Sequence, residues 1–320
     1  MPLSTIGPGS VTGGGPKFDI VSLGECLVEF NRRDDGSFDP GFAGDAFNAL
    51  FYAGRLGARA GFISAVGDDL FTPMILGGIE REGIDISQVL RLERRRNGLY
   101  FIELDAGGEY TFHFWRERSA ATATLLHHQL DPLADYITGA RIFLITGVTL
   151  AVMEGPERLL RLLELVRADG GTRVALDTNY RRRLWSSPEA YRERFETILP
   201  FADILLPTRA DLEEVYGAGP IEPMLRELAA AGPGLIAMKC GADGCALLTD
   251  GELRRYPAPE RITPVDTTGA GDAFNAGFLT ALLEGRSHEE CCAVGQRVAA
   301  RALRVRGALD HTITRSGLGL

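Results

Sequence analysis

The chain has 320 residues, of which 45% are hydrophobic and 24% are charged, and its formal net charge is −9. These fractions are typical of a water-soluble globular protein, and the length suits one large α/β domain or two ordinary ones. An acidic chain lacks the basic face that nucleic acid requires, and no apolar run reaches the length of a membrane span. We therefore expect neither a nucleic-acid partner nor a membrane partner.

The N-terminal residues and the cysteines indicate the cellular compartment of the protein. Residues 1–16 are rich in Gly, Ser, Thr and Pro, which predicts a disordered tail, and no signal-peptide pattern is visible there. Five cysteines without zinc-type spacing fit a reducing compartment. We expect a cytoplasmic protein with a single folded domain over residues 17–320.

Buried strands alternate with helical patterns along most of the chain. This alternation predicts an α/β fold with a mainly parallel sheet between two layers of helices. In such folds ligands bind at the carboxyl ends of the strands. The predicted strands are 18–23, 60–66, 141–146, 173–177, 203–206, 235–239 and 245–249, the last one antiparallel at an edge. Two predicted helices end near residues 56 and 81, and the others span residues 155–169, 188–199, 209–216, 222–231 and 273–283.

Two segments interrupt this alternation. Residues 99–104 and 110–115 alternate in polarity around Asp105-Ala106-Gly107-Gly108, which predicts a β-hairpin. Residues near 28–42 have a second hairpin pattern. We expect the segments 28–42 and 97–117 to form a small β-sheet that acts as a lid over the site.

The most informative stretch runs from Val265 to Gly277, where a Gly-rich turn leads into an apolar helix. The backbone N–H groups of Gly269, Ala270 and Gly271 and the helix dipole suit a phosphate. Asp272, at the start of the helix, can accept a proton from an attacking hydroxyl, which predicts phosphoryl transfer to an alcohol. A helix N-terminus contributes only roughly 0.3–1 kcal/mol to anion binding, so a metal ion and alignment of the reactants must contribute too.

Residues 266–274, Asp-Thr-Thr-Gly-Ala-Gly-Asp-Ala-Phe, resemble the C-terminal signature of the ribokinase (PfkB) family of carbohydrate kinases. Gly44-Asp45-x-x-Asn48 before an Ala-rich helix resembles its N-terminal signature. The resemblance covers about residues 18–310. It implies a ribokinase-like fold, ATP with Mg²⁺, an optional monovalent cation and a homodimer formed through the lid sheets. We expect Asp45 also to cap its helix.

Arginines narrow the substrate class. Gly98-Leu99-Tyr100, Phe114-Trp115-Arg116 and the stretch 177–185 resemble 2-keto-3-deoxygluconate kinases of that family, although close relatives often have Tyr in place of Phe114. Arg can hold the carboxylate of a sugar acid with two parallel hydrogen bonds. The resemblance implies that the substrate-binding residues are Gly44, Asn48, Tyr100, Phe114, Arg116 and Arg181, the last reaching either the substrate carboxylate or a nucleotide phosphate.

The stretch Lys239-Cys240-Gly241-Ala242-Asp243-Gly244 matches the family's Lys-x-Gly-x-x-Gly. Lys239 is expected near the phosphates or as a charge at the sheet edge. Thr208 and Asp211 stand where the family has Asn-x-x-Glu, so Asp211 is expected to contact Mg²⁺ through water. The implied ATP-binding residues are Asn179, Lys239, Gly241, Gly244, Gly269 and Gly271.

Three functions remain open on the sequence. The first is an ATP-dependent kinase that phosphorylates the terminal hydroxyl of a sugar acid, with 2-keto-3-deoxygluconate as the expected substrate. The second keeps the mechanism but accepts a neutral sugar such as fructose or ribose, or a nucleoside. The third is a non-catalytic sugar-binding regulator, suggested by the departures at Thr208 and Asp211.

Overall fold

The computed structural model of the chain describes residues 15–33, 35–104 and 110–320. The predicted tail, apart from its last two residues, and the predicted hairpin turn at 105–108 lie outside the described residues. None of the described helices is long and apolar enough to cross a lipid bilayer.

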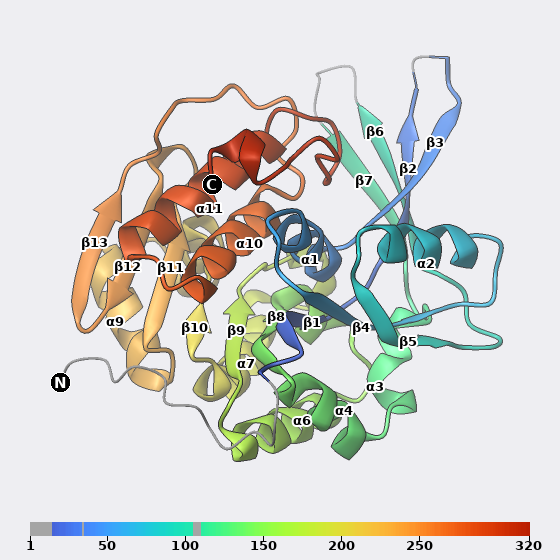
Figure 1. Cartoon of the computed structure of the whole chain (residues 1–320), viewed down its shortest axis with the longest axis horizontal. Helices are drawn as coiled ribbons and strands as arrows, with labels where there is room; N and C mark the ends of the chain where they lie inside the picture. Colours follow the sequence, from blue (N-terminus) through green and yellow to red (C-terminus); the bar gives the residue numbers. More distant parts are fainter. Residues whose placement is uncertain (1–14, 34, 105–109) are drawn as a thin grey trace.

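A large sheet forms the centre of the described structure (Figure 1). Its nine strands have the order β13-β12-β11-β10-β9-β8-β1-β4-β5, and neighbours pair in parallel except at β12 and β13. The predicted parallel sheet with an antiparallel edge is therefore confirmed. The strands are β1 (Phe18–Leu23), β4 (Ala60–Val66), β5 (Asp85–Arg91), β8 (Ala140–Thr146), β9 (Arg173–Asp177), β10 (Ile204–Leu205), β11 (Leu235–Lys239), β12 (Cys245–Thr249) and β13 (Glu252–Tyr256).

The two strands that the sequence did not predict are the two edges of this sheet, β5 and β13. Both are largely half-buried or exposed, so their residues do not form a continuous apolar run. Backbone hydrogen bonds to a neighbouring strand hold each of them in the sheet, and this pairing leaves no local sequence signal.

The predicted small sheet is also present. It contains β2 (Leu27–Arg32), β3 (Phe38–Ala43), β6 (Leu99–Leu104) and β7 (Tyr110–Trp115) in the order β3-β2-β6-β7, and it projects beside the large sheet (Figure 1). Glu29 pairs with Tyr100, which pairs with Phe114, so these three side chains share one face of the sheet. The opposite face carries the packed rings of Phe30 and Phe101.

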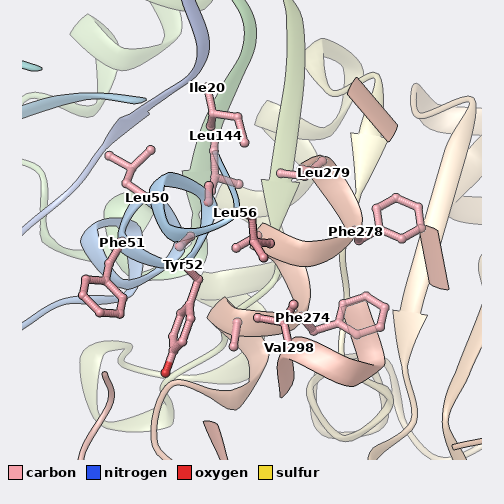
Figure 2. Close-up of a cluster of buried hydrophobic side chains, with 14 of the residues drawn as sticks. Ile20, Leu50, Phe51, Tyr52, Leu56, Leu144, Phe274, Phe278, Leu279 and Val298 are labelled. Atoms are coloured by element: carbon pink, nitrogen blue, oxygen red, sulfur yellow. The ribbon is translucent and has the colours of Figure 1, made fainter. Parts of the chain in front are cut away.

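Helices cover both faces of the large sheet because successive residues of its buried strands point to opposite sides. Ile20 packs in one core and Val21 in the other. Figure 2 shows the first core between α1 and α10. This face is covered by α1 (Asp45–Arg55), α2 (Thr72–Arg81), α10 (Ala270–Leu283) and α11 (His288–Ala302). The other face is covered by α4 (Leu130–Thr138), α5 (Gly147–Val152), α6 (Pro156–Asp169), α7 (Pro188–Ile198), α8 (Arg209–Tyr216) and α9 (Ile221–Ala231), with the short α3 (Thr124–His127) before them.

Helix α10 begins three residues earlier than predicted, at Ala270, so Asp272 lies within its first turn. Its position is fixed by close packing against α11. A Cβ on Gly277 would lie 2.8 Å from Cγ2 of Val298 and 3.0 Å from Cα of Gly295. The absence of side chains at these two glycines therefore lets the helices approach closely, which holds the N-terminus of α10 in place.

Candidate active site

The site residues come from elements that end at one edge of the large sheet. β1, β8, β9 and β11 are parallel, and Glu25, Thr146, Asp177 and Lys239 lie at or just beyond their carboxyl ends. The N-termini of α1 and α10 meet at this edge, because Asn48 of α1 hydrogen-bonds Asp272 of α10. Side chains that are far apart in the sequence therefore share one site.

The Gly-rich turn before α10 has a backbone that requires glycine. Gly269 is the N-cap residue with φ of 75°, and a Cβ there would lie 2.6 Å from the carbonyl oxygen of Ala308. Asp266 holds the turn in place. Its carboxylate accepts hydrogen bonds from the backbone amide and the hydroxyl of Thr268 and from the backbone amide of Gly307. The loop is thus set by its own contacts.

Of the three expected anion-binding amides, those of Gly269, Ala270 and Gly271, only that of Ala270 has an acceptor among the residues that the structure describes. The amide of Ala270 donates to the carbonyl oxygen of Thr267 at 3.3 Å, so it is not free, contrary to the expectation from the sequence. The amides of Gly271 and Asp272 have no hydrogen-bond acceptor among the residues that the structure describes. Two donors at the positive end of the helix dipole are therefore directed at the same place.

Asp272 is 8% exposed, and Asn48 donates a hydrogen bond of 2.8 Å to its Oδ2. The amide of Gly44 donates to Oδ1 of Asn48 at 3.2 Å, which fixes the orientation of the Asn48 side chain. Burial, and next the negative charge of Asp45, raise the pKa of Asp272 to about 8. A carboxyl group with this pKa gains and loses its proton near neutral pH, which is what a general base requires.

Asp45 has a different role from the predicted helix cap. Gly44 is the N-cap residue of α1, and no side chain caps this helix. The carboxylate of Asp45 instead accepts a hydrogen bond of 2.9 Å from Nδ2 of Asn179, whose φ of 30° is unusual for a residue with a side chain. Burial raises the pKa of Asp45, and when this carboxyl group is ionised it adds negative charge beside Asp272.

Arg181 balances part of this negative charge. It follows β9 and is exposed to solvent. Its guanidinium lowers the pKa of both Asp45 and Asp272, and this coupling places its charge on the side of the two carboxyl groups. The exposed arginine run that begins at Arg181 therefore includes a charge that acts on both carboxyl groups.

Lys239 is neither an edge charge nor a free phosphate ligand. It is 8% exposed, and its Nζ donates to Oδ1 of Asp177 at 2.8 Å and to Oδ1 of Asn275 at 2.9 Å. Asn275 in turn donates to Oδ2 of Asp177 at 2.8 Å. Nζ would lie 3.9 Å from a Cβ on Gly271. The network of Lys239, Asp177 and Asn275 therefore packs against the Gly-rich turn and supports it.

The other expected nucleotide residues lie near the end of β11. Gly241 has φ of 58° with open space around it, whereas a Cβ on Gly244 would collide with the carbonyl oxygen of Tyr256. Gly244 is thus required by the packing of β13. Asp211 accepts hydrogen bonds on Oδ2 from the hydroxyl of Thr178 at 2.7 Å and the amide of Tyr180 at 3.3 Å, and burial raises its pKa.

The small sheet presents Tyr100 and Phe114 on one face, with their ring centres 5.2 Å apart. The hydroxyl of Tyr100 donates to Oε2 of Glu29, and Asn31 donates to the other oxygen of Glu29 at 2.6 Å. Tyr100 is 5% exposed and Phe114 is 44% exposed. Phe114 is therefore the more accessible of the two aromatic residues.

Arg116 follows β7 and pairs with Glu25, with 2.7 Å between Nη1 and Oε1. The ring of Phe114 stacks 4.8 Å from the guanidinium carbon. Burial raises the pKa of Glu25 to about 7, although the charge of Arg116 acts in the opposite direction. The sequence assigned no role to Glu25, and its one local signal is its place directly after a buried strand.

Gly44 also has a structural reason to be glycine. A Cβ on Gly44 would collide with the carbonyl oxygen of Glu25. Asp177 and Asn275 were likewise missed as site residues. Asp177 ends a buried strand, and Asn275 lies three residues after Asp272 on the same side of α10, so spacing could have indicated both.

Comparisons with known proteins agree with this arrangement. Residues 17–315 match the model of the pfkB family carbohydrate kinases, so the chain belongs to that family and is a carbohydrate kinase. This finding leaves no support for a non-catalytic regulator. A structure of a PfkB protein from Polaromonas sp. JS666 shares the ribokinase-like fold, with a TM-score of 0.81 and 26% identity over 94% of this chain and 99% of that chain.

The chain is also similar in sequence to 2-dehydro-3-deoxygluconokinases. The chain is 34% identical to the 2-dehydro-3-deoxygluconokinase of Escherichia coli K12 over 299 residues, which are 91% of this chain and 96% of the relative. It is 33% identical to the 2-dehydro-3-deoxygluconokinase of Dickeya dadantii over 302 residues, with the same coverage.

The buried network beneath the turn gives a prediction about stability. We expect Lys239→Ala to lower the free energy of unfolding by about 3–5 kcal/mol, because Asp177 would keep a buried charge without its partner. Arg254→Ala is the matched control, since the side chains of the Arg254–Glu252 pair are 61% and 65% exposed, and we expect it to leave the free energy of unfolding nearly unchanged. Urea unfolding followed by circular dichroism measures both, and equal losses would contradict the assignment.

Proposed function

We propose that this kinase transfers the γ-phosphate of ATP to the terminal hydroxyl of a sugar acid. The expected reaction converts 2-keto-3-deoxygluconate, also called 2-dehydro-3-deoxygluconate, to its 6-phosphate. One observation carries this proposal: the buried base Asp272 shares its edge of the sheet with two arginines, Arg116 and Arg181. A neutral sugar gives no chemical reason for two guanidinium groups, whereas a carboxylate does.

The mechanism follows from the geometry around Asp272. The ionised carboxylate accepts the proton of the terminal hydroxyl, and Asn48 holds it in position through the hydrogen bond to Oδ2. The hydroxyl oxygen forms a bond to the γ-phosphorus while the bond to the bridging oxygen breaks, and ADP leaves. The free amides of Gly271 and Asp272, in the turn that Gly269 and Ala270 complete, stabilise the charge on the transferred group.

For ATP, we propose contacts with Asn179, Gly241 and Gly244 next to the turn, while Lys239, whose Nζ is held by Asp177 and Asn275, supports the turn and does not contact a phosphate. The described residues contain no group of three or more His, Cys, Asp or Glu side chains that could hold a metal. This fits Mg²⁺, which often binds through phosphates and water, where it neutralises phosphate charge. Asp211 would contact such a water with Oδ1, because Oδ2 already accepts two protein hydrogen bonds. A monovalent cation stays a prediction.

A neutral acceptor such as fructose or ribose remains the second candidate because of one specific observation. Arg116 is already paired with Glu25, so its charge is balanced before any substrate arrives. A balanced pair attracts a carboxylate less strongly than a free arginine does. A substrate comparison therefore has to decide between the two acceptor classes.

We also propose a cytoplasmic protein whose residues 17–320 form one ribokinase-like domain, with the segments 28–42 and 97–117 inserted as the lid. The Arg116–Glu25 pair, which links the end of β7 to the chain just after β1, supports this placement of the lid. A homodimer through the outer face of the lid is supported by the exposed aromatic residues there, Phe38 at 42% and Trp115 at 58%.

Removal of the base should stop the chemistry and spare nucleotide binding. We expect Asp272→Asn to lower kcat by about 10²–10⁴-fold, the usual contribution of a general base, with the affinity for ATP changed little. ADP release and calorimetric titration with ATP measure the two quantities. The exposed Asp131→Asn serves as the control, and an Asp272→Asn enzyme with near-normal turnover would exclude the proposed role.

The raised pKa of Asp272 predicts the pH profile. Because the base must be ionised, kcat/KM should rise with pH and level off above a pH of about 8. Removal of the negative charge in Asp45→Asn should lower the pKa of Asp272, so the half-maximal pH should move to lower values. Rates of ADP release between pH 6 and 9.5 test this, and an unmoved profile in Asp45→Asn would contradict it.

A substrate panel tests the acceptor class. With the wild type we expect ADP release on 2-keto-3-deoxygluconate and weaker activity on fructose and ribose. Arg116→Ala should raise the KM for the sugar acid by about tenfold or more, because a charge-assisted hydrogen bond is lost, and should change the KM for fructose far less. Equal effects on the two substrates would favour the neutral acceptor.

A further inference from the structure

Glu25 has an unusual place for a charged residue. Its side chain is 2% exposed, two residues beyond the end of β1, and its ion-pair partner Arg116 is 12% exposed just after β7. The pair therefore joins the large sheet to the small sheet. A charge so deeply buried requires a compensating partner, and Arg116 is the cation that the structure supplies.

The backbone on both sides of the pair is tightly confined. The carbonyl oxygen of Glu25 lies against Gly44, where any side chain would collide with it. A Cβ on Gly98 would lie 3.1 Å from Cβ of Arg116, so the two residues are in close contact. Neither backbone has room to shift, so both side chains start from fixed positions. The direction of the Arg116 guanidinium is then set by its contact with Glu25.

The pair is also incomplete. Oε2 of Glu25 and Nε of Arg116 are both buried without a hydrogen-bond partner in the part of the chain that the structure describes. An ion pair that served only to hold the fold together would be expected to use these atoms, because an unsatisfied buried polar atom is costly. Nε of Arg116 is a donor on a charged group, so an anionic acceptor such as a carboxylate would satisfy it.

We propose that Glu25 is a positioning residue that sets the preference for sugar acids. It holds Nη1 of Arg116 and so leaves the Nε side of the guanidinium for the substrate carboxylate. Since the pair is neutral overall, recognition depends on the direction of the donors more than on net attraction. This inference rests on the proposed sugar-acid kinase activity and extends it to a residue outside the expected site.

Two substitutions separate position from charge. Glu25→Gln keeps the length of the side chain and an oxygen that accepts from Nη1, but removes the charge. Glu25→Asp keeps the charge but is one methylene shorter and does not reach Nη1. The matched control is Glu154→Gln, which removes the carboxylate of a second arginine pair near the small sheet, Arg95–Glu154, at 2.9 Å.

The expected readout is a change in KM that is confined to the acid substrate. Glu25→Asp should raise the KM for 2-keto-3-deoxygluconate by about tenfold or more, with kcat and the KM for fructose changed by less than about threefold. Glu25→Gln should stay within about threefold of the wild type on both substrates. In the double variant with Arg116→Ala, Glu25→Asp should add no further loss, because the two residues act as one unit.

Each other outcome overturns a defined part of the argument. If the wild type phosphorylates fructose or ribose and no sugar acid, the proposed function fails and the inference about Glu25 fails with it. If the wild type uses the sugar acid but Glu25→Asp affects both substrates equally, or adds to Arg116→Ala, only the inference fails. Thermal unfolding of every variant identifies losses caused by misfolding, and in that case the near-isosteric Glu25→Gln must still retain the preference.

Discussion

The site depends on one hydrogen bond between two helix N-termini, from Nδ2 of Asn48 to Oδ2 of Asp272. The two residues are 224 positions apart in the sequence, and the bond fixes the base relative to the first helix of the chain. Two helix dipoles converge there, and the free amides of α10 point at the same place. The fold thus places the carboxyl group of Asp272 beside amides that have no acceptor among the described residues.

Close backbone packing makes this convergence durable. Gly44 and Gly269 both stand where a side chain would strike another part of the backbone, and Gly277 lets α10 lie against α11. Each of these glycines therefore allows a close contact that a side chain would prevent. The consequence for function is that the reacting groups sit on rigid elements, which favours alignment of an acceptor hydroxyl with a phosphate.

Charge balance shapes the rest of the site. Asp45, Asp177 and Asp272 bring three carboxyl groups to one edge of the sheet, and burial raises the pKa of Asp45 and of Asp272. Lys239 compensates Asp177 directly, and Arg181 acts on the other two at longer range. The pKa of Asp272 is therefore raised by burial and by Asp45 and lowered by Arg181. Under the proposed function, the same charges would set both the proton affinity of the base and the preference for an anionic substrate.

The sequence alone determined the fold class, the turn around Gly269 and the small sheet, because periodicity, glycine spacing and hairpin signals act over a few residues. It did not show the edge strands β5 and β13, the partners of Lys239 or the pairing of Glu25 with Arg116. These features arise only when strands distant in sequence lie side by side and water is excluded between them. Burial and proximity, which set charge partners and pKa values, are properties of the tertiary structure.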